Sequence, residues 1–204
     1  MIFAQILSGS NGNFTYIFGD EQTKEAAIVD PGDDVKEVLR HMQRLKVYVK
    51  YIFNTHSHRD HTGGNSQIKD KTRAKVVMHV SAPLSKDIAV RDQDQIKVGK
   101  LSVKVIHTPG HTPDGICLLV GNKLFTGDTL FIGDCGRTDL PGGSSKDMYR
   151  SLFDKILPLD DNIEVYPGHD YDKMHSSTVG HERKTNYTLK KRNLNEFVQF
   201  MKGS

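Results

Sequence analysis

Three histidines and one aspartate lie within six residues of each other: His56, His58, Asp60 and His61. An apolar run at 47–53 comes directly before them and predicts a strand. In an extended chain, residues two apart point to the same side, so His56 and His58 face one point. If the chain then turns into a helix, Asp60 and His61 face a neighbouring point. Imidazole and carboxylate are metal ligands, so the spacing predicts two adjacent metal pockets rather than a polar surface loop.

Three further candidate ligands share a pattern in which a glycine follows an apolar run and directly precedes the ligand. They are His111 after Gly110, Asp128 after Gly127 and His169 after Gly168. Glycine allows a sharp backbone turn, and strand ends are where a sheet scaffold presents chemistry. One such residue alone would be a weak signal, but together they predict a common rim. Asp30 and Asp134 could orient these ligands through hydrogen bonds.

The elements that must position these residues alternate in type. Strands are expected at 2–7, 14–18, 26–29, 47–53, 75–80, 101–106, 116–120, 123–125 and 163–166. Helices are expected from apolar residues at helical spacing: Val35, Val38, Leu39, Met42 and Leu45, then Met148, Leu152 and Ile156, and last Leu194, Phe197, Val198 and Met201. Because a block of strands precedes alternating helices and strands in each half, we expect two packed sheets with helices outside, an α/β arrangement. No linker divides the chain, so we expect one domain over residues 1–204.

Composition narrows the function classes. The chain has 204 residues, ten histidines and two cysteines, with 36% hydrophobic and 26% charged residues. A bound metal would therefore be held by imidazole and carboxylate, and scarce cysteine with no signal-like or membrane-spanning segment predicts a cytoplasmic protein without membrane partners. The net charge is +3 and the pI about 8.7. The basic residues at 183–192 fit a solvated helix face or attraction of a small anion, and no basic stripe indicates nucleic-acid binding.

The pattern His-x-His-x-Asp-His at 56–61, followed by separate His, Asp and His, resembles the metallo-β-lactamase fold superfamily. The resemblance covers nearly the whole chain. It implies an αββα sandwich of two mixed sheets with outer helices and a metal site at one edge. It also implies a first metal pocket, a second pocket, and Asp128 between them. The first would contain His56, His58 and His111, and the second Asp60, His61 and His169.

Finer motifs at 133–139, 166–171 and 177–183 resemble the persulfide dioxygenases, which are relatives of glyoxalase II. The resemblance implies that Arg137, Tyr171 and Arg183 hold glutathione, and guanidinium groups suit its carboxylates. Cys135 would lie near the substrate sulfur or simply pack. The resemblance also implies a homo-oligomer and a small anionic thiol substrate such as glutathione persulfide. In contrast, residues 140–143 resemble short glyoxalase II-like hydrolases.

Two mechanisms fit the same ligand candidates. In the dioxygenase hypothesis, His56, His111 and Asp128 hold one Fe(II) and are the catalytic set, and the other four candidates orient ligands and water. Glutathione persulfide would then be oxidised with O₂ to sulfite and thiol. In the alternative, all seven candidates hold two Zn(II) ions, and a metal-activated hydroxide hydrolyses a thioester. A third possibility is a metal-binding module without turnover.

Overall fold

The computed structural model of the protein describes residues 1–8, 12–171 and 174–203. Its first sheet has six strands in the order β1-β2-β3-β4-β5-β6. Strands β1 to β3 are antiparallel, and β3 to β6 are parallel. The strands are β1 (Ile2–Ser8), β2 (Asn13–Gly19), β3 (Glu25–Val29), β4 (Tyr48–Phe53), β5 (Lys75–His79) and β6 (Ile88–Val90).

The second sheet also has six strands, in the order β12-β11-β10-β9-β8-β7. Only β10 and β11 are parallel, and the other neighbours are antiparallel. Both sheets are therefore mixed, as the family resemblance implies. The strands are β7 (Gln95–Val98), β8 (Leu101–His107), β9 (Ile116–Val120), β10 (Lys123–Gly127), β11 (Glu164–Pro167) and β12 (Ser177–Thr178).

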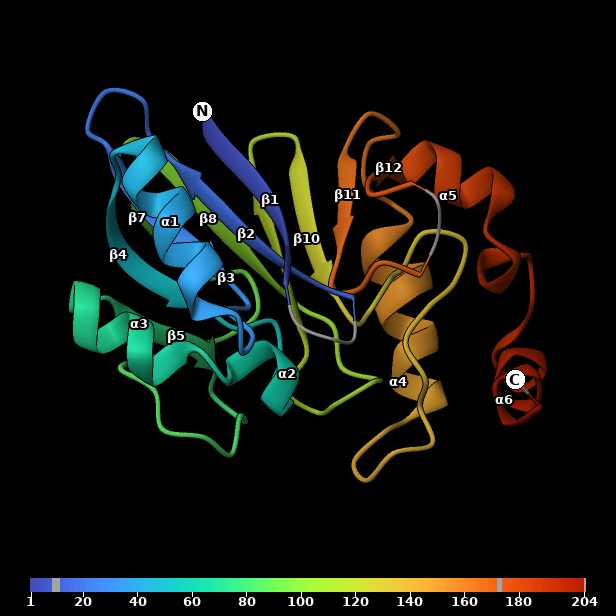
Figure 1. Cartoon of the computed structure of the whole chain (residues 1–204). Coiled ribbons are helices and arrows are strands. Elements are labelled where there is room, and N and C mark those ends of the chain that lie inside the picture. Colours follow the sequence, from blue (N-terminus) through green and yellow to red (C-terminus); the bar gives the residue numbers. More distant parts are fainter. Residues whose placement is uncertain (9–11, 172–173, 204) are drawn as a thin grey trace.

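Helices cover the outer faces of the two sheets, as Figure 1 shows for α1 on one side and α4 on the other. The α-helices are α1 (Val35–Leu45), α2 (Arg59–Thr62), α3 (Asn65–Thr72), α4 (Ser145–Arg150), α5 (Val179–Thr185) and α6 (Leu194–Lys202). A π-helical segment η1 (Ser151–Ile156) continues α4, and a 3₁₀ turn η2 (Tyr187–Leu189) follows α5. No helix in the described part of the chain is long and apolar enough to cross a membrane.

Three apolar clusters account for this layering. Phe18 and Val29 of the first sheet pack against Leu118 and Phe125 of the second, in the space between the sheets. A second cluster joins α1 and α3 to the outer face of the first sheet. A third joins α4, η1 and α6 to the outer face of the second sheet. The αββα sandwich is confirmed, because each sheet buries one face against the other sheet and one against helices.

Side chains cap the N-termini of the three helices that the sequence predicts. Asp34 accepts a hydrogen bond from the Glu37 amide at the start of α1, and Ser144 does the same for Asp147 at α4. At α6, a full capping box joins Asn193 and Glu196.

Several short elements were not expected from the sequence: α3, α5, β6, β7 and β12. In α3 only Ile68 is buried, so the segment has no apolar stripe to show helical spacing. The short strands have two to four residues, too few to establish an alternation. The helix that was conditional on a turn after His58 does form, because α2 begins at Arg59.

Candidate metal centre

The seven candidate ligands converge from four segments, each of which follows the carboxyl end of a strand. The segment with His56, His58, Asp60 and His61 follows β4, and His111, Asp128 and His169 follow β8, β10 and β11. Strand β4 belongs to the first sheet and the other three to the second. The candidates therefore meet at one edge of the sandwich, where both sheets end.

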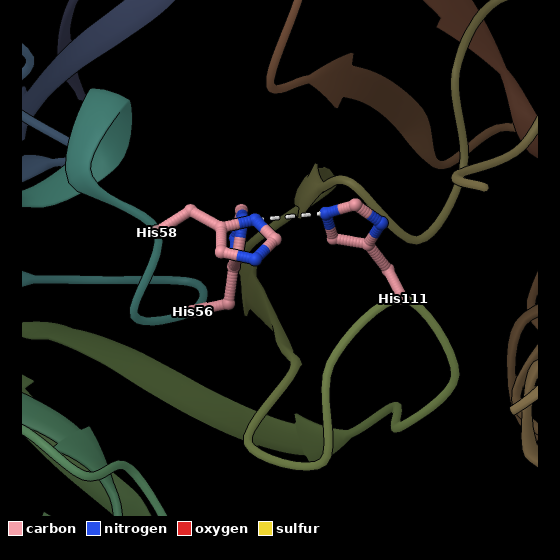
Figure 2. Close-up of side chains that lie close together, drawn as sticks. All are labelled: His56, His58 and His111. Atoms are coloured by element: carbon pink, nitrogen blue, oxygen red, sulfur yellow. Dashed lines mark hydrogen bonds between the residues drawn. The ribbon is translucent and has the colours of Figure 1, made fainter. Parts of the chain in front are cut away.

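The first convergent group is His56, His58 and His111, whose rings point toward one another (Figure 2). Nδ1 of His58 lies 3.0 Å from Nε2 of His56 and 3.0 Å from Nε2 of His111. Burial lowers the pKa of both His56 and His58, and the charges of neighbouring histidines lower it further. The neutral imidazole favoured in this way is the form that binds metals.

The second convergent group is Asp60, His61 and His169. Nε2 of His61 lies 3.2 Å from Nε2 of His169, and Asp60 Oδ2 lies 3.5 Å and 3.4 Å from these two nitrogens. Asn13 donates to Asp60 Oδ2 at 2.9 Å and so fixes that carboxylate. Asn13 is 47 residues away in the sequence, where nothing marks it as part of the site.

Asp128 lies between the two groups. Its Oδ2 is 3.5 Å from His111 Nε2 and 3.4 Å from His169 Nε2, and its Oδ1 is 3.4 Å from His61 Nε2. Burial raises the pKa of this carboxyl, but the charge of His61 and the hydrogen bond of His169 outweigh it, so the pKa falls well below the usual range. Asp128 forms a third convergent group with His56 and His61.

The residues present fit a metal. Asp128 Oδ1 is buried without a hydrogen-bond partner among the described residues, although buried polar atoms are ordinarily paired. Gly168 leaves room for this oxygen, since a Cβ there would lie 2.4 Å from it. Imidazole and carboxylate donors suit iron and zinc. The set His56, His111 and Asp128, proposed as the iron face, is spread over two of the three convergent groups.

Asp30 orients one candidate ligand, His61, and also holds Thr55. Its Oδ1 accepts from the Thr55 amide at 2.7 Å, and its Oδ2 accepts from the Thr55 hydroxyl at 2.6 Å. Nδ1 of His61 lies 3.0 Å from Asp30 Oδ2, so it donates and leaves Nε2 facing the centre. Burial lowers the pKa of His61, but Asp128 and Asp30 raise it to about 9. Asp134, the other expected orienting residue, instead pairs with the backbone of its own loop.

A cavity of about 220 Å³ borders the candidate ligands at His111 and Asp128. We call it the Arg137 cavity; its other lining residues include Phe131, Cys135 and Tyr171. The ring of Tyr171 stacks in parallel on His169 with centroids 5.0 Å apart. The exposed guanidinium of Arg137 forms two 2.7 Å hydrogen bonds with the Asp139 carboxylate. Arg137 and Tyr171 are thus brought together beside the ligands.

Cys135 lines the same cavity, but its thiol packs in the core. Its side chain belongs to the apolar cluster behind the second sheet, and Sγ lies 3.9 Å from Met201 Sδ. Burial and then the charge of Asp134 raise the pKa of the thiol to about 12. The thiol is therefore protonated near neutral pH and is a poor nucleophile.

Arg183 is not brought to the Arg137 cavity. Its guanidinium donates to the backbone carbonyls of Leu157 and Leu159 and pairs with Asp161, at the far end of η1. The preceding residue on α5 has the larger structural role, because Glu182 is fully buried. The motif at 177–183 therefore contributes an internal contact rather than the expected guanidinium.

Glu182 holds the loop that forms the wall of the Arg137 cavity. Its Oε2 accepts from the Gly133 amide at 2.8 Å and from Asn186 Nδ2 at 2.9 Å, and its Oε1 accepts from the Ser177 hydroxyl at 2.5 Å. Asn186 also donates to the carbonyl of Asp134 at 3.0 Å. Sequence reasoning missed this role, because a lone glutamate on a charged helix reads as exposed.

Comparison with known proteins agrees with this geometry. Residues 8–83 and 80–169 match the family described as the Metallo-beta-lactamase superfamily. The chain belongs to this superfamily. The solved structure of ETHE1 from Myxococcus xanthus superposes on 99% of this chain and 90% of its own, with a TM-score of 0.95 and 34% identity.

Two curated relatives carry different names at similar identity. The mitochondrial persulfide dioxygenase ETHE1 of Homo sapiens is 32% identical over 98% of this chain and 80% of its own length. A hydroxyacylglutathione hydrolase of Pelagibacter ubique is 35% identical over 88% of this chain and 76% of its own length. By sequence identity, the chain is about equally similar to a relative named as a dioxygenase and to one named as a hydrolase.

Proposed function

We propose that the protein is an iron-dependent persulfide dioxygenase that oxidises glutathione persulfide, or a related thiol persulfide, with O₂ to sulfite and thiol. The observation that carries this proposal is the 0.95 TM-score with an ETHE1 structure over 99% of the chain. The match to the human persulfide dioxygenase likewise extends over 98% of the chain, against 88% for the hydrolase.

The reaction balances as one persulfide, one O₂ and one water giving one thiol, one sulfite and two protons. The two sulfur atoms together lose four electrons to O₂. A ferrous ion held by His56, His111 and Asp128 would supply the redox chemistry that activates O₂ toward the persulfide sulfur. Nδ1 of His111 donates to the Arg137 carbonyl at 2.8 Å, and this bond leaves Nε2 free to act as the ligand.

The other residues bind and orient the substrate in this proposal. Arg137 offers the substrate carboxylate the N–H groups that Asp139 does not engage, since a guanidinium has five donors and binds carboxylates in bidentate geometry. Tyr171 covers the part of the substrate that carries the thiol. Its side chain is 64% exposed, and its ring lies against His169. His58, Asp60, His61 and His169 hold water and ligands in place by hydrogen bonds.

A second candidate function, thioester hydrolysis with two zinc ions, is favoured by one specific observation. The candidate ligands form separate convergent groups with Asp128 between them, so the same residues could hold two ions. The hydroxyacylglutathione hydrolase relative fits this alternative. In that case all seven candidates would bind metal, and Arg137 would bind the glutathione part of the thioester.

Metal content and turnover, measured on the same anaerobically purified sample, test the proposal. We expect one iron per chain and O₂ uptake that depends on glutathione persulfide, with sulfite as product. Two zinc ions together with hydrolysis of S-lactoylglutathione would instead establish the hydrolase. A bound metal with neither activity would indicate a binding module.

A further inference from the structure

A second cavity, of about 400 Å³, borders the candidate metal centre at His58. We call it the Asp114 cavity. The Arg137 cavity borders the same centre at His111, whose Nε2 lies 3.0 Å from His58 Nδ1. The two cavities therefore meet the ligands at adjacent rings. The polar residues that line the Asp114 cavity are Ser57, His58, Ser81, Thr112 and Asp114.

Two of the residues that line this cavity each carry a buried polar atom without a partner in the described part of the chain. Thr112 is 4% exposed and Asp114 is 3% exposed, and neither Thr112 Oγ1 nor Asp114 Oδ2 has a hydrogen-bond partner among the described residues. Within that part of the chain, only Asp128 and Asp170 carry another such side-chain atom. Asp128 belongs to the candidate metal centre. Because buried polar atoms are ordinarily satisfied, two unsatisfied ones in a single cavity wall point to a ligand group.

The chemistry of the wall selects a cationic hydrogen-bond donor. A carboxylate only accepts hydrogen bonds, and Asp114 Oδ1 already accepts one from Ser57 Oγ at 3.3 Å. None of the ion pairs in the described residues includes Asp114. Burial and then the charge of His107 lower the pKa of nearby His79 to about 4, so this histidine is neutral and adds no positive charge beside Asp114. An anion would be repelled, whereas an ammonium group would satisfy the free oxygen once the Asp114 side chain turns toward the cavity.

We propose that the Asp114 cavity receives the ammonium group of the thiol substrate, with Asp114 and Thr112 as the residues that determine this specificity. This inference rests on the proposed function. A thiol peptide such as glutathione carries its ammonium and its glycine carboxylate at opposite ends. Its sulfur lies at the metal ligands when the carboxylate is at Arg137 and the ammonium is at Asp114.

Binding of two unreactive thioethers to the metal-loaded protein tests this inference. S-methylglutathione keeps the ammonium group, and its N-acetyl derivative lacks the charge. Each is titrated by calorimetry into the wild-type protein, D114N, T112V and the control D154N. Asp154 is an exposed carboxylate on η1, so D154N makes the same chemical change away from the cavity.

We expect N-acetylation to weaken binding to wild-type protein and to D154N by about tenfold or more, as for other hydrogen bonds with charged groups. The D114N substitution should weaken the binding of S-methylglutathione by a similar factor. The variant should then bind both thioethers with equal affinity. The T112V substitution should weaken the binding of S-methylglutathione by a smaller factor, because this variant keeps the Asp114 carboxylate. It also tests the cavity should D114N fail to fold.

Equal binding of the two thioethers to wild-type protein overturns the inference and means that internal water satisfies these atoms. An unchanged preference in both D114N and T112V overturns it as well. Because neither thioether is oxidised, this binding test does not depend on turnover. The dioxygenase proposal has its own test, and it fails if no O₂ uptake is measured. If neither thioether binds wild-type protein, the glutathione part of the proposed function fails together with this inference.

Discussion

The backbone carbonyl of Arg137 accepts a hydrogen bond from Nδ1 of His111 at 2.8 Å. A carbonyl can only accept, so this bond fixes the His111 tautomer and directs its Nε2 toward the candidate metal centre. The side chain of the same arginine lines the adjacent cavity. One residue therefore orients a candidate ligand through its backbone and faces the substrate through its side chain.

Arg137→Ala separates these two roles. The backbone bond to His111 remains, so we expect metal content to stay at the wild-type level. Loss of the guanidinium should raise KM for glutathione persulfide by about tenfold to a hundredfold, the value of a charge-assisted contact. Arg150→Ala, which removes an exposed arginine of α4, is the matched control. A loss of metal in Arg137→Ala, measured by elemental analysis, would contradict this assignment.

Asp30→Asn tests the support beneath the ligands. Asp30 has a φ of 49°, a backbone conformation that asparagine tolerates, so the fold should be retained. The variant loses the charge that holds Nδ1 of His61, and we expect metal affinity to fall by about tenfold to a hundredfold. Competition with a chelator measures this, with Asp70→Asn on the exposed side of α3 as the control. Equal affinity in both variants would show that Asp30 is dispensable.

Gly168→Ala should expel the metal without unfolding the protein. The added Cβ would lie 2.4 Å from Asp128 Oδ1 and 2.9 Å from His61 Cε1, so both ligands must shift. Gly121→Ala is the contrast, because its φ of 61° is strained for alanine but no atom lies within 4 Å. We expect Gly121→Ala to lose about 1–2 kcal/mol of stability and keep its metal. Full metal occupancy in Gly168→Ala would refute the packing argument.

Substitutions at the neighbouring residues Glu182 and Arg183 should have different effects, since Glu182 is buried and Arg183 is at the surface. Glu182→Ala removes the acceptor of three hydrogen bonds and leaves the Gly133 amide and the Ser177 hydroxyl without this partner. We expect the free energy of unfolding in urea to fall by about 2–4 kcal/mol, because donors that lose their acceptor inside the protein are costly. Arg183→Ala should leave KM for glutathione persulfide unchanged, because its guanidinium pairs at the end of η1. A tenfold rise of KM in Arg183→Ala would return this arginine to the substrate site.

His79 should make the protein less stable in mild acid. Burial and the charge of His107 lower its pKa to about 4 in the folded state, against about 6.5 in the unfolded chain. Between these values the unfolded chain binds more protons, so this contribution to stability falls as the pH drops from about 6.5 to 4. His79→Asn should flatten that part of the urea stability profile, and His181→Asn at an exposed position should not. Parallel profiles for wild-type and His79→Asn would contradict the shift.

The sequence determined the local features of this protein. Short-range backbone geometry determines where His56, His58 and His61 point after the apolar strand. It also determines that the apolar residues of α1 form one stripe. The fold class followed because the order of strands and helices restricts how sheets can pack. Short elements such as α3 and β6 are not predicted, because their residues show no helical or alternating apolar pattern.

Only the tertiary structure decided which residues meet across long separations. Asn13 reaches Asp60, and Glu182 turns inward while Arg183 turns away, although neighbouring residues on a helix look alike in sequence. Cys135 and Arg137 line one cavity, yet the Cys135 thiol packs on Met201. The sequence specifies side-chain chemistry, whereas burial and orientation depend on how the sheets and helices enclose each side chain.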